Sequence, residues 1–280
     1  MSGPSHPTFP QLPPVAVAMA GLDLDAAGLA PIAPGGERVR GLIGWLARAG
    51  ARGLRIDATA AGIRPRELDR SGRRDLAALL RRSELAFAGV DFFIPPEHFL
   101  KPDMVDRAVS GVLAAIDLAA DLAGLGAGSV VTRSTSPASV SIVLPEKLAP
   151  DMRRSLSDHA LSQGVRLADH AWPIGERDGG SADEGEAIGI GLDPATVLSA
   201  GADPIMLAAK IGSRLVCARL SDIGAGAPGS ARIAPGSGRL DVTAYLATLV
   251  TVGYTGHVIL DLHGLRDPAG AIAGVVPRPG

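Results

Sequence analysis

Charged side chains stand at the ends of apolar segments in the last third of this chain. Arg219 and Asp222 close the apolar run that begins at residue 215, and Asp261 closes the run that begins at residue 258. A Pro-Gly-Ser-Gly loop, residues 235–238, separates the two runs. Polar groups at the carboxyl ends of buried parallel strands form the active sites of α/β barrels. The pattern therefore predicts a site at one end of a parallel barrel.

Other predicted strand ends offer groups for acid–base chemistry or anion binding. Glu97 and His98 follow the Pro-Pro turn after the third strand, and they form either an acid–base pair in the mouth or a capping acid beside a surface imidazole. Asp57 lines the mouth or caps a loop. Arg133, just past the fourth predicted strand, is placed to bind an anion.

Five arginines follow the second predicted strand. They either clamp a phosphate or a sugar carboxylate, or form a solvated face whose partners are nearby acids. The five are Arg64, Arg66, Arg70, Arg73 and Arg74.

Short apolar runs alternate with helical patterns along the whole chain, which is typical of a parallel sheet. Eight such runs favour a closed (β/α)₈ TIM barrel over an open sheet, and no G-x-G-x-x-G follows the first run, which argues against a dinucleotide site. The predicted strands span residues 15–20, 53–58, 85–94, 129–132, 165–169, 188–192, 215–220 and 258–262, with a weaker extended run at 140–144. Helices are predicted at 37–49, 73–82, 103–122, 151–163, 203–211 and 242–252.

These elements predict one domain. The barrel spans residues 15–265, between a flexible proline-rich tail at 1–14 and a C-terminal tail at 266–280. The polar, glycine-rich segment 175–187 is either a mobile loop over the site or, as we favour, a surface insertion.

Composition excludes several classes of function. The net charge of −2 provides no basic field for nucleic acid or anionic lipid. No apolar run approaches the roughly 20 residues of a membrane span, and the N-terminus lacks the pattern of a secretory signal, so we expect a cytoplasmic protein. The single cysteine, Cys217, excludes an intramolecular disulfide and a multi-cysteine metal site, and we expect it in the core.

Three segments resemble the sugar phosphate isomerase/epimerase family of xylose isomerase-like (β/α)₈ barrels. Residues 215–222 followed by 235–241 are similar to the family's strand ending in H-x-x-D and its P-G-x-G-x-[ILV]-D loop. Residues 253–261 resemble its G-Y-x-G and the following strand with a terminal Glu. Residues 191–201 resemble its strand ending in Asp, with Ala-Gly a few residues later.

The resemblance implies a divalent metal, Mg²⁺, Mn²⁺ or Zn²⁺, held by Glu, Asp, His and Glu on four strands. In the family a glutamate or a neighbouring base moves a proton between adjacent sugar carbons. By position, the first Glu falls on Asp169, the Asp on Asp193, the His on Arg219 and the last Glu on Asp261. A further family His falls near Thr196, so only Asp193 is unchanged.

These departures work against metal binding. Aspartate reaches about 1.5 Å less far than glutamate, and Mg²⁺ needs oxygen ligands at about 2.0–2.1 Å. Arg219 only donates hydrogen bonds and cannot ligate. It can instead relieve the repulsion among carboxylates gathered in one mouth. We therefore hypothesise a catalytic cluster of Asp169, Asp193, Arg219 and Asp261 that works without a metal. If a divalent metal is retained, the three aspartates hold it.

Seven further residues are expected to bind substrate around this cluster: Asp57, Glu97, His98, Arg133, His170, Asp222 and Arg239. His170, beside Asp169, would restore one nitrogen ligand, although adjacent strand residues face opposite sides except at a ragged strand end. Asp222 is otherwise a turn aspartate that starts the loop.

The resemblance implies an isomerase or epimerase that acts on, or binds, a small sugar or polyol by proton transfer. The alternative is a non-catalytic small-molecule-binding or scaffold relative that has lost the metal. A third alternative is an abasic-site DNA endonuclease, which shares the barrel; six scattered histidines and the net charge of −2 argue against it. Barrels of this family often pair, so a homodimer is expected.

Overall fold

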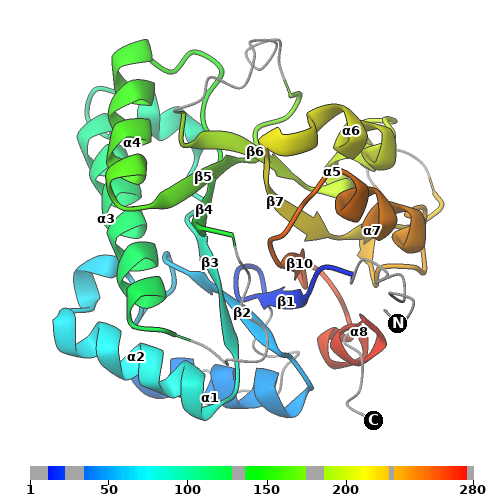
Figure 1. Cartoon of the computed structure of the whole chain (residues 1–280), viewed down its shortest axis with the longest axis horizontal. Helices are drawn as coiled ribbons and strands as arrows, with labels where there is room; N and C mark the ends of the chain where they lie inside the picture. Colours follow the sequence, from blue (N-terminus) through cyan, green and yellow to red (C-terminus); the bar gives the residue numbers. More distant parts are fainter. Residues whose placement is uncertain (1–11, 23–34, 128–135, 175–185, 227–229, 276–280) are drawn as a thin grey trace, which may run out of the picture.

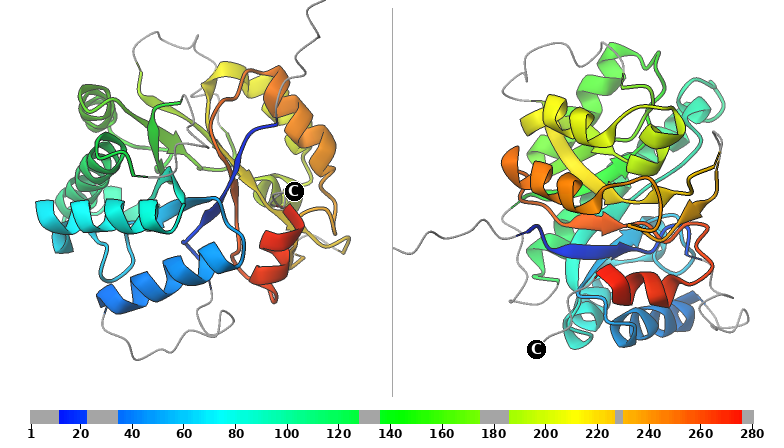
Figure 2. Two further views of the ribbon diagram at one scale, coloured as in Figure 1. Left: turned by 60° about the horizontal axis from the view of Figure 1, so that its bottom comes forward. Right: turned by 90° about the vertical axis from the view of Figure 1, so that its right-hand side faces the viewer.

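Eight parallel strands close into a barrel, as the sequence predicts. The computed structural model describes residues 12–22, 35–127, 136–174, 186–226 and 230–275. Around the barrel the strand order is β1-β10-β7-β6-β5-β4-β3-β2, and the left view of Figure 2 shows the helices outside the ring. The strands are β1 Val15–Ala18, β2 Gly53–Asp57, β3 Ala86–Asp91, β4 Ala138–Ile142, β5 Val165–Asp169, β6 Ile188–Leu192, β7 Leu215–Leu220 and β10 Val258–Leu260.

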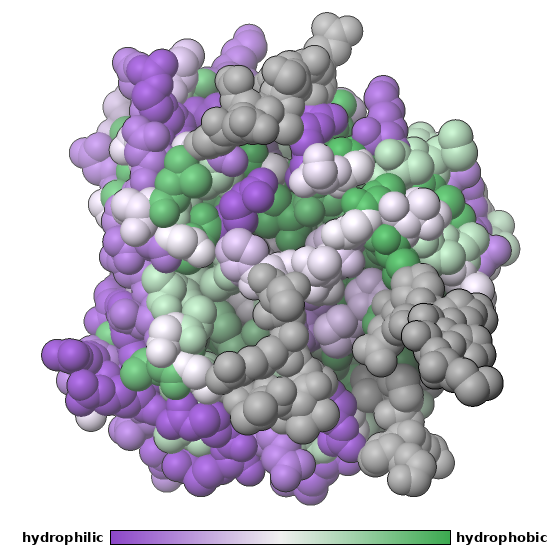
Figure 3. All heavy atoms as spheres, in the orientation of Figure 1, coloured by the Kyte–Doolittle hydropathy of each residue, from purple (hydrophilic) through white to green (hydrophobic). Residues whose placement is uncertain are grey.

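Amphipathic helices cover the outside of the barrel (Figure 1). In α2, Leu76 and Leu80 are buried while the arginines face outwards, and hydrophilic side chains gather over this helix at the lower left of Figure 3. Asp203 begins α6 by accepting the backbone N–H groups of residues 205 and 206, as an N-cap does. The helices are α1 Gly35–Arg48, α2 Arg70–Arg82, α3 Val105–Gly124, α4 Pro150–Ser162, α5 Pro194–Ser199, α6 Pro204–Ile211, α7 Val242–Thr251 and α8 Pro268–Val275, with 3₁₀ turns η1 Pro65–Glu67, η2 Pro96–Phe99 and η5 Gly212–Arg214.

The structure differs from the prediction at the fourth strand and near the C-terminus. The fourth barrel position is taken by β4, where the sequence predicted only the weaker extended run, and β4 pairs with both β3 and β5. The strand predicted at 129–132 lies outside the described residues, as does most of segment 175–187. Within the expected tail 266–280, α8 forms instead and buries Ile272 completely, because its apolar residues join the core cluster that includes Val17 of β1 and Leu260 of β10.

Small side chains fill the centre of the barrel. One buried cluster joins residues from β1, β5, β7 and β10, some of which are not neighbours in the barrel: Ala16, Ala168, Cys217 and Ile259. Side chains of such strands can meet only inside the barrel. Cys217 is buried there, as predicted. A Cβ on Gly53 would lie 2.8 Å from the Cβ of Ala16, so the space is narrow as well as apolar. These short residues leave room for long polar side chains from the other strands.

A small hairpin follows β7. β8 Asp222–Ile223 pairs antiparallel with β9 Arg232–Ile233, with Asp222 opposite Ile233. The sequence pattern does not predict this hairpin. It returns the chain towards the barrel mouth and brings Arg232 there. Among the described residues, none of the helices combines the length and apolar character needed to cross a bilayer.

Candidate functional site

Six side chains of alternating charge form a continuous series from the barrel interior to its mouth. Three arginines and three aspartates take part, so their formal charges cancel. Successive nitrogen–oxygen distances are 2.6, 2.7, 3.5, 3.1 and 2.6 Å. We call this series the charge chain; its members, in order, are Arg55, Asp91, Arg219, Asp261, Arg232 and Asp193.

The inner half of the charge chain is sealed. Asp91 is fully buried, and its Oδ1 accepts from both Arg55 Nε and Arg219 Nη2. Burial raises the pKa of Asp91, but the positive charges of Arg219 and Arg55 outweigh it and hold the pKa below its usual value. Arg55 also donates to the hydroxyls of Ser139 and Ser141 and to the carbonyls of residues 88 and 90, so its donors are all used.

The outer half is partly open to solvent. The side chains of Arg232, Asp193 and Asp261 are 24%, 15% and 9% exposed. Arg232 bridges the two aspartates through its two terminal nitrogens, and Ser221 donates to Asp193 Oδ1. Burial raises the pKa of Asp193, yet the charge of Arg232 and the Ser221 hydrogen bond lower it to about 2. Asp193 is therefore ionised at neutral pH.

His170 lies beside the charge chain. Its Nε2 is 2.9 Å from the Ser141 hydroxyl, and its ring packs edge-on against Phe93 with centroids 5.7 Å apart. The guanidinium of Arg219 covers the same Phe93 ring at 5.0 Å. Burial, and then the charge of Arg219, lower the pKa of His170 to about 3. The ring is therefore neutral at physiological pH, and its buried Nδ1 has no hydrogen-bond partner among the described residues.

The predicted cluster is reassembled in part. Asp193, Arg219 and Asp261 share the charge chain, but Asp169 does not. Because side chains alternate along a strand and Ala168 faces the interior, Asp169 faces the other way, and its Oδ1 accepts the backbone N–H groups of residues 144 and 171. This corrects the carry-over of a metal ligand to Asp169. His170 takes the inward place.

Asp222 holds a loop. It is fully buried, and its two carboxyl oxygens accept five backbone N–H groups, those of Ile223, Gly236, Gly238, Arg239 and Leu240. Both oxygens are thus occupied by backbone donors of the loop, and the expected role of Asp222 in substrate binding stays an untested prediction. Arg239 is turned away: its side chain is exposed and donates to the carbonyl of Leu198 at the end of α5. The Pro-Gly-Ser-Gly motif therefore wraps around Asp222.

Three other predicted residues stand apart from the charge chain, and a fourth is not described. Asp57 ends β2, where its Oδ1 accepts the N–H and the hydroxyl of Thr59, so it stabilises a turn. Glu97 is exposed on η2, and His98 lines a cavity between η2 and α3, so the two do not form an acid–base pair in the mouth. Arg133 lies outside the described residues.

Three members of the charge chain, Arg55, Asp91 and Arg232, were not among the residues predicted from the sequence. Arg55 and Asp91 follow apolar residues at alternate positions in β2 and β3, so the strand period carried a signal for an inward direction. A charged residue in the middle of a buried strand must find a partner, and Arg55 finds Asp91 on the neighbouring strand. Arg232 carried no such signal, since the hairpin that delivers it was not predicted.

The residues present do not fit the divalent metal that the resemblance implies. The carry-over positions Asp193 and Asp261 both point at the guanidinium of Arg232, and Arg219 stands where the family has a ligating imidazole. A guanidinium offers no lone pair and repels a cation. Within the described part of the chain, no group of three His, Cys, Asp or Glu side chains is arranged to hold a metal ion.

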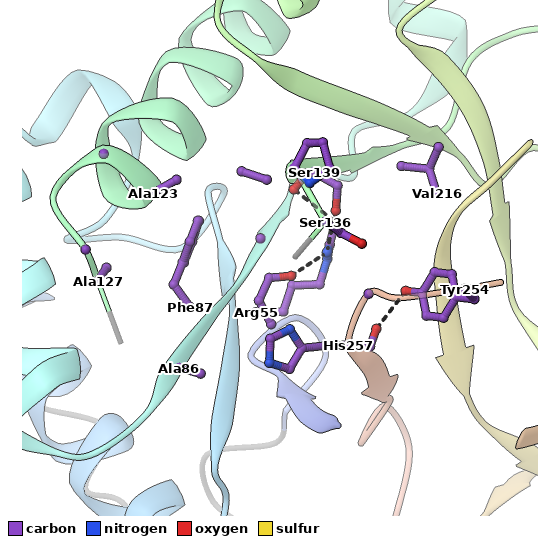
Figure 4. Close-up of a pocket in the computed structure, with 17 residues that line it drawn as sticks. Arg55, Ala86, Phe87, Ala123, Ala127, Ser136, Ser139, Val216, Tyr254 and His257 are labelled. Carbon is purple, nitrogen blue, oxygen red and sulfur yellow. Dashed lines mark hydrogen bonds between the residues drawn. The ribbon is translucent and has the colours of Figure 1, made fainter. Parts of the chain in front are cut away.

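A hollow of about 370 Å³ lies at the opposite, amino-terminal end of the strands (Figure 4). Arg55 and Ser139 approach it from inside the barrel, while the Tyr254 hydroxyl donates to the carbonyl of His257 at its edge. Arg55 is the one arginine or lysine among the described lining residues of this hollow, and its donors are already used within the protein. The outer half of the charge chain is the better candidate for binding.

Comparisons with known proteins agree with this architecture. No protein-family profile matches the chain, and a search of curated proteins finds no match. Among solved structures, a xylose isomerase domain protein from Planctomyces limnophilus matches with a TM-score of 0.65 and 16% identity, over 94% of this chain and 95% of that one. A xylose isomerase-like TIM barrel protein from Mycobacterium smegmatis, solved with magnesium, has the same TM-score and identity over 93% of both chains.

A third match is the 3-keto-D-glucoside 4-epimerase of E. coli, with a TM-score of 0.64 and 14% identity over 94% of this chain and 97% of that one. Identities this low establish the fold and leave the chemistry to be argued from this chain's own residues. The chain adopts the xylose isomerase-like TIM-barrel fold.

Proposed function

We propose that this protein binds a small polyol or sugar-like molecule at the outer half of the charge chain, without a metal ion and without proton transfer. The observation that carries the proposal is the bridge from Arg232 to both Asp193 and Asp261. It supplies positive charge between two carboxylates that would otherwise attract a cation.

The exposed part of the bridge suits a ligand rich in hydroxyl groups. Asp193 and Arg232 are both partly accessible and lie 2.6 Å apart. A carboxylate accepts hydrogen bonds and a guanidinium donates them, whereas a vicinal diol does both. Because the charge chain is neutral as a whole, it gives no net attraction to a strongly charged ligand.

The pKa values argue against proton transfer. A catalytic base works best with a pKa near the working pH. The pKa of Asp193 is about 2 and that of His170 about 3, so both are weak bases at neutral pH. With no metal to acidify the sugar carbon, these groups supply little driving force for removing its proton.

A proton-transferring isomerase or epimerase is the second candidate. It is favoured by neutral His170 beside the charge chain, whose buried Nδ1 has no hydrogen-bond partner among the described residues. The two candidates share a ligand class and differ in whether a C–H bond of the ligand breaks.

One experiment separates them. The purified protein is titrated calorimetrically with a panel of aldoses, ketoses and polyols, and each binder is then incubated in deuterated water with and without Mn²⁺. We expect saturable binding and no deuterium at carbon. Asp193→Asn should weaken binding, while the surface variant Asp117→Asn serves as the matched control.

Two results would overturn the proposal. Deuterium incorporation at a sugar carbon would establish proton transfer. Stoichiometric metal in the purified protein, lost in Asp193→Asn, would establish a metal site in spite of Arg232.

A further inference from the structure

A second cavity, of about 760 Å³, lies outside the barrel. It is enclosed by the turn after β2 with η1, the segment after β3, and the first half of α3. Phe92 lines this cavity, while the next residue, Phe93, packs under Arg219 of the charge chain. Adjacent residues thus serve two separate spaces. The volume falls within the roughly 300–1,000 Å³ of small-molecule sites.

Its walls are apolar. The Phe92 ring lies against α3 at Gly111, where a Cβ would come within 2.5 Å of the ring's Cζ, so glycine is required for this close approach. Further wall residues come from the segment after β3 and from successive turns of α3. They are Ile94, Met104, Ala108 and Ala114.

Its rim is basic. Arg64 lies at the edge but is already engaged, since it donates to the carbonyl of Thr59 and pairs with Glu67. Arg66 and Arg107 also line the cavity, are exposed, and form no ion pair with any residue that the structure describes. Asp103 is the one acidic residue among the lining residues of this cavity. Glu67, which is not a lining residue, lies close enough to Arg64 and Arg66 for both charges to lower its pKa. The described lining nevertheless has three arginines and one aspartate, so the rim carries a surplus of positive charge over an apolar interior.

We propose that this cavity is a binding site for an amphipathic anion, a molecule with an apolar tail and one carboxylate or phosphate group. The tail occupies the space between Phe92, Met104 and Ala114, and the anionic group is held at the rim by Arg66 and Arg107. Guanidinium groups suit both anions because they donate two parallel hydrogen bonds. The inference is independent of ligand binding at the charge chain.

Decanoate, decyl phosphate and decyltrimethylammonium, each below its micellar concentration, are the probes. Isothermal titration calorimetry should show one saturable site for the two anions and much weaker binding of the cation of equal tail length. The double variant Arg66→Glu/Arg107→Glu should bind decanoate about tenfold more weakly or worse, because two attractive charges become repulsive; tenfold corresponds to about 1.4 kcal/mol of binding free energy. Arg74→Glu, an exposed arginine on α2 away from the cavity, is the matched control and should bind within about twofold of wild type.

A second variant tests the interior. Ala114→Phe fills the space between α3 and Phe92 and should abolish decanoate binding while ligand binding at the charge chain is kept. If Ala114→Phe does not fold, the arginine double variant still tests the site, because its substitutions are at exposed positions. Equal affinity for decanoate and the cationic probe, or undiminished binding by the double variant, would overturn the proposal. So would a concentration-dependent dimer that is lost in Ala114→Phe, because a second copy of the chain would then be the occupant.

Discussion

Arg232 is the residue on which the character of the mouth depends. It stands between the carboxylates of Asp193 and Asp261, two positions that the family resemblance assigns to metal ligands. Replacing it by alanine leaves Asp193 partly buried without this cation, and leaves Asp261 with Arg219 alone at 3.5 Å. The Arg232→Ala variant should therefore lose about 1–3 kcal/mol in the free energy of unfolding, less than for a fully buried pair because the guanidinium is 24% exposed.

Mn²⁺ should partly reverse this loss. With the guanidinium gone, a divalent cation can occupy the space between the carboxylates and raise the melting temperature of the variant by mass action, whereas the wild type should not respond. Arg239→Ala is the control, because the exposed side chain of Arg239 donates to the Leu198 carbonyl and is not a member of the charge chain. A wild-type protein that Mn²⁺ stabilises as strongly as the variant would contradict the assignment.

His170 makes a separate prediction about pH. Its folded-state pKa of about 3 lies below the usual value of 6.5, so between these pH values the unfolded chain binds a proton that the folded chain does not. Stability should therefore fall as the pH is lowered from about 6.5 towards 3, by at most about 1.4 kcal/mol per pH unit and less because the ring is partly exposed. His170→Gln should flatten this part of a urea-denaturation profile; an unchanged slope would place the proton elsewhere.

Residue type and strand-end position were enough to predict three members of the charge chain. Arg219 and two aspartates follow apolar runs, and parallel strands bring their ends together. The sequence did not show which of Asp169 and His170 points into the barrel, because a shift of one residue along a strand exchanges the side chains that face inwards with those that face outwards. The role of Arg232 depended on a tertiary contact of a hairpin too short to leave a periodic pattern.

At the scale of elements, the motif most suggestive of chemistry proves to be structural. Gly238 lies against β8: an added Cβ would come within 2.2 Å of the Ile223 carbonyl oxygen and 2.6 Å of Asp222 Oδ1. The loop from residue 236 to 240 encircles one carboxylate and thereby fixes β8, the partner of β9, which carries Arg232. The P-G-x-G motif therefore reflects the structural role of this loop around Asp222.

Gly238→Ala tests this reading. The clash is with backbone and a buried carboxylate, so we expect a loss of about 2–3 kcal/mol in the free energy of unfolding, as for overpacked interiors. The control is Gly124→Ala at the end of α3, where an added Cβ meets nothing within 4 Å and stability should be unchanged or higher. Unaltered stability of Gly238→Ala, measured by chemical denaturation, would show that the loop can relax.

Most helices and strands could be predicted because the repeat of their apolar residues and the residues that mark their ends lie within the segment itself. Helix α6 begins at an Asp-Pro pair, and α3 shows an apolar stripe over five turns. β4 was underestimated because its small and polar residues, Ala-Ser-Val-Ser-Ile, carry a weak apolar signal. Those serines face the interior and accept from Arg55, so the polarity that hid the strand is what the barrel centre requires.

At the scale of the molecule, a buried ion network replaces part of the usual apolar barrel core. TIM-barrel interiors are commonly filled by branched apolar residues, whereas here Arg55, Asp91 and Arg219 span the space between alanine-lined strands. Such networks do not guarantee stability, because the cost of desolvation offsets the attraction. Removing one partner is nevertheless severe, since the others remain buried and unpaired.

Asp91→Asn is the decisive variant at this scale. It keeps the shape of the side chain but leaves two buried guanidinium groups facing a neutral amide, so the free energy of unfolding should fall by about 3–5 kcal/mol. Asp117→Asn, which removes a half-exposed partner of His159, should cost less than about 1 kcal/mol.

Because the arginines lower the pKa of Asp91, its ionised form stabilises the fold above the unfolded value of about 3.9, and that stabilisation is lost as the pH falls through the lower folded value. The wild type should therefore show an acid transition that Asp91→Asn lacks in part, and a variant as stable as the wild type would mean that the barrel interior tolerates uncompensated positive charge.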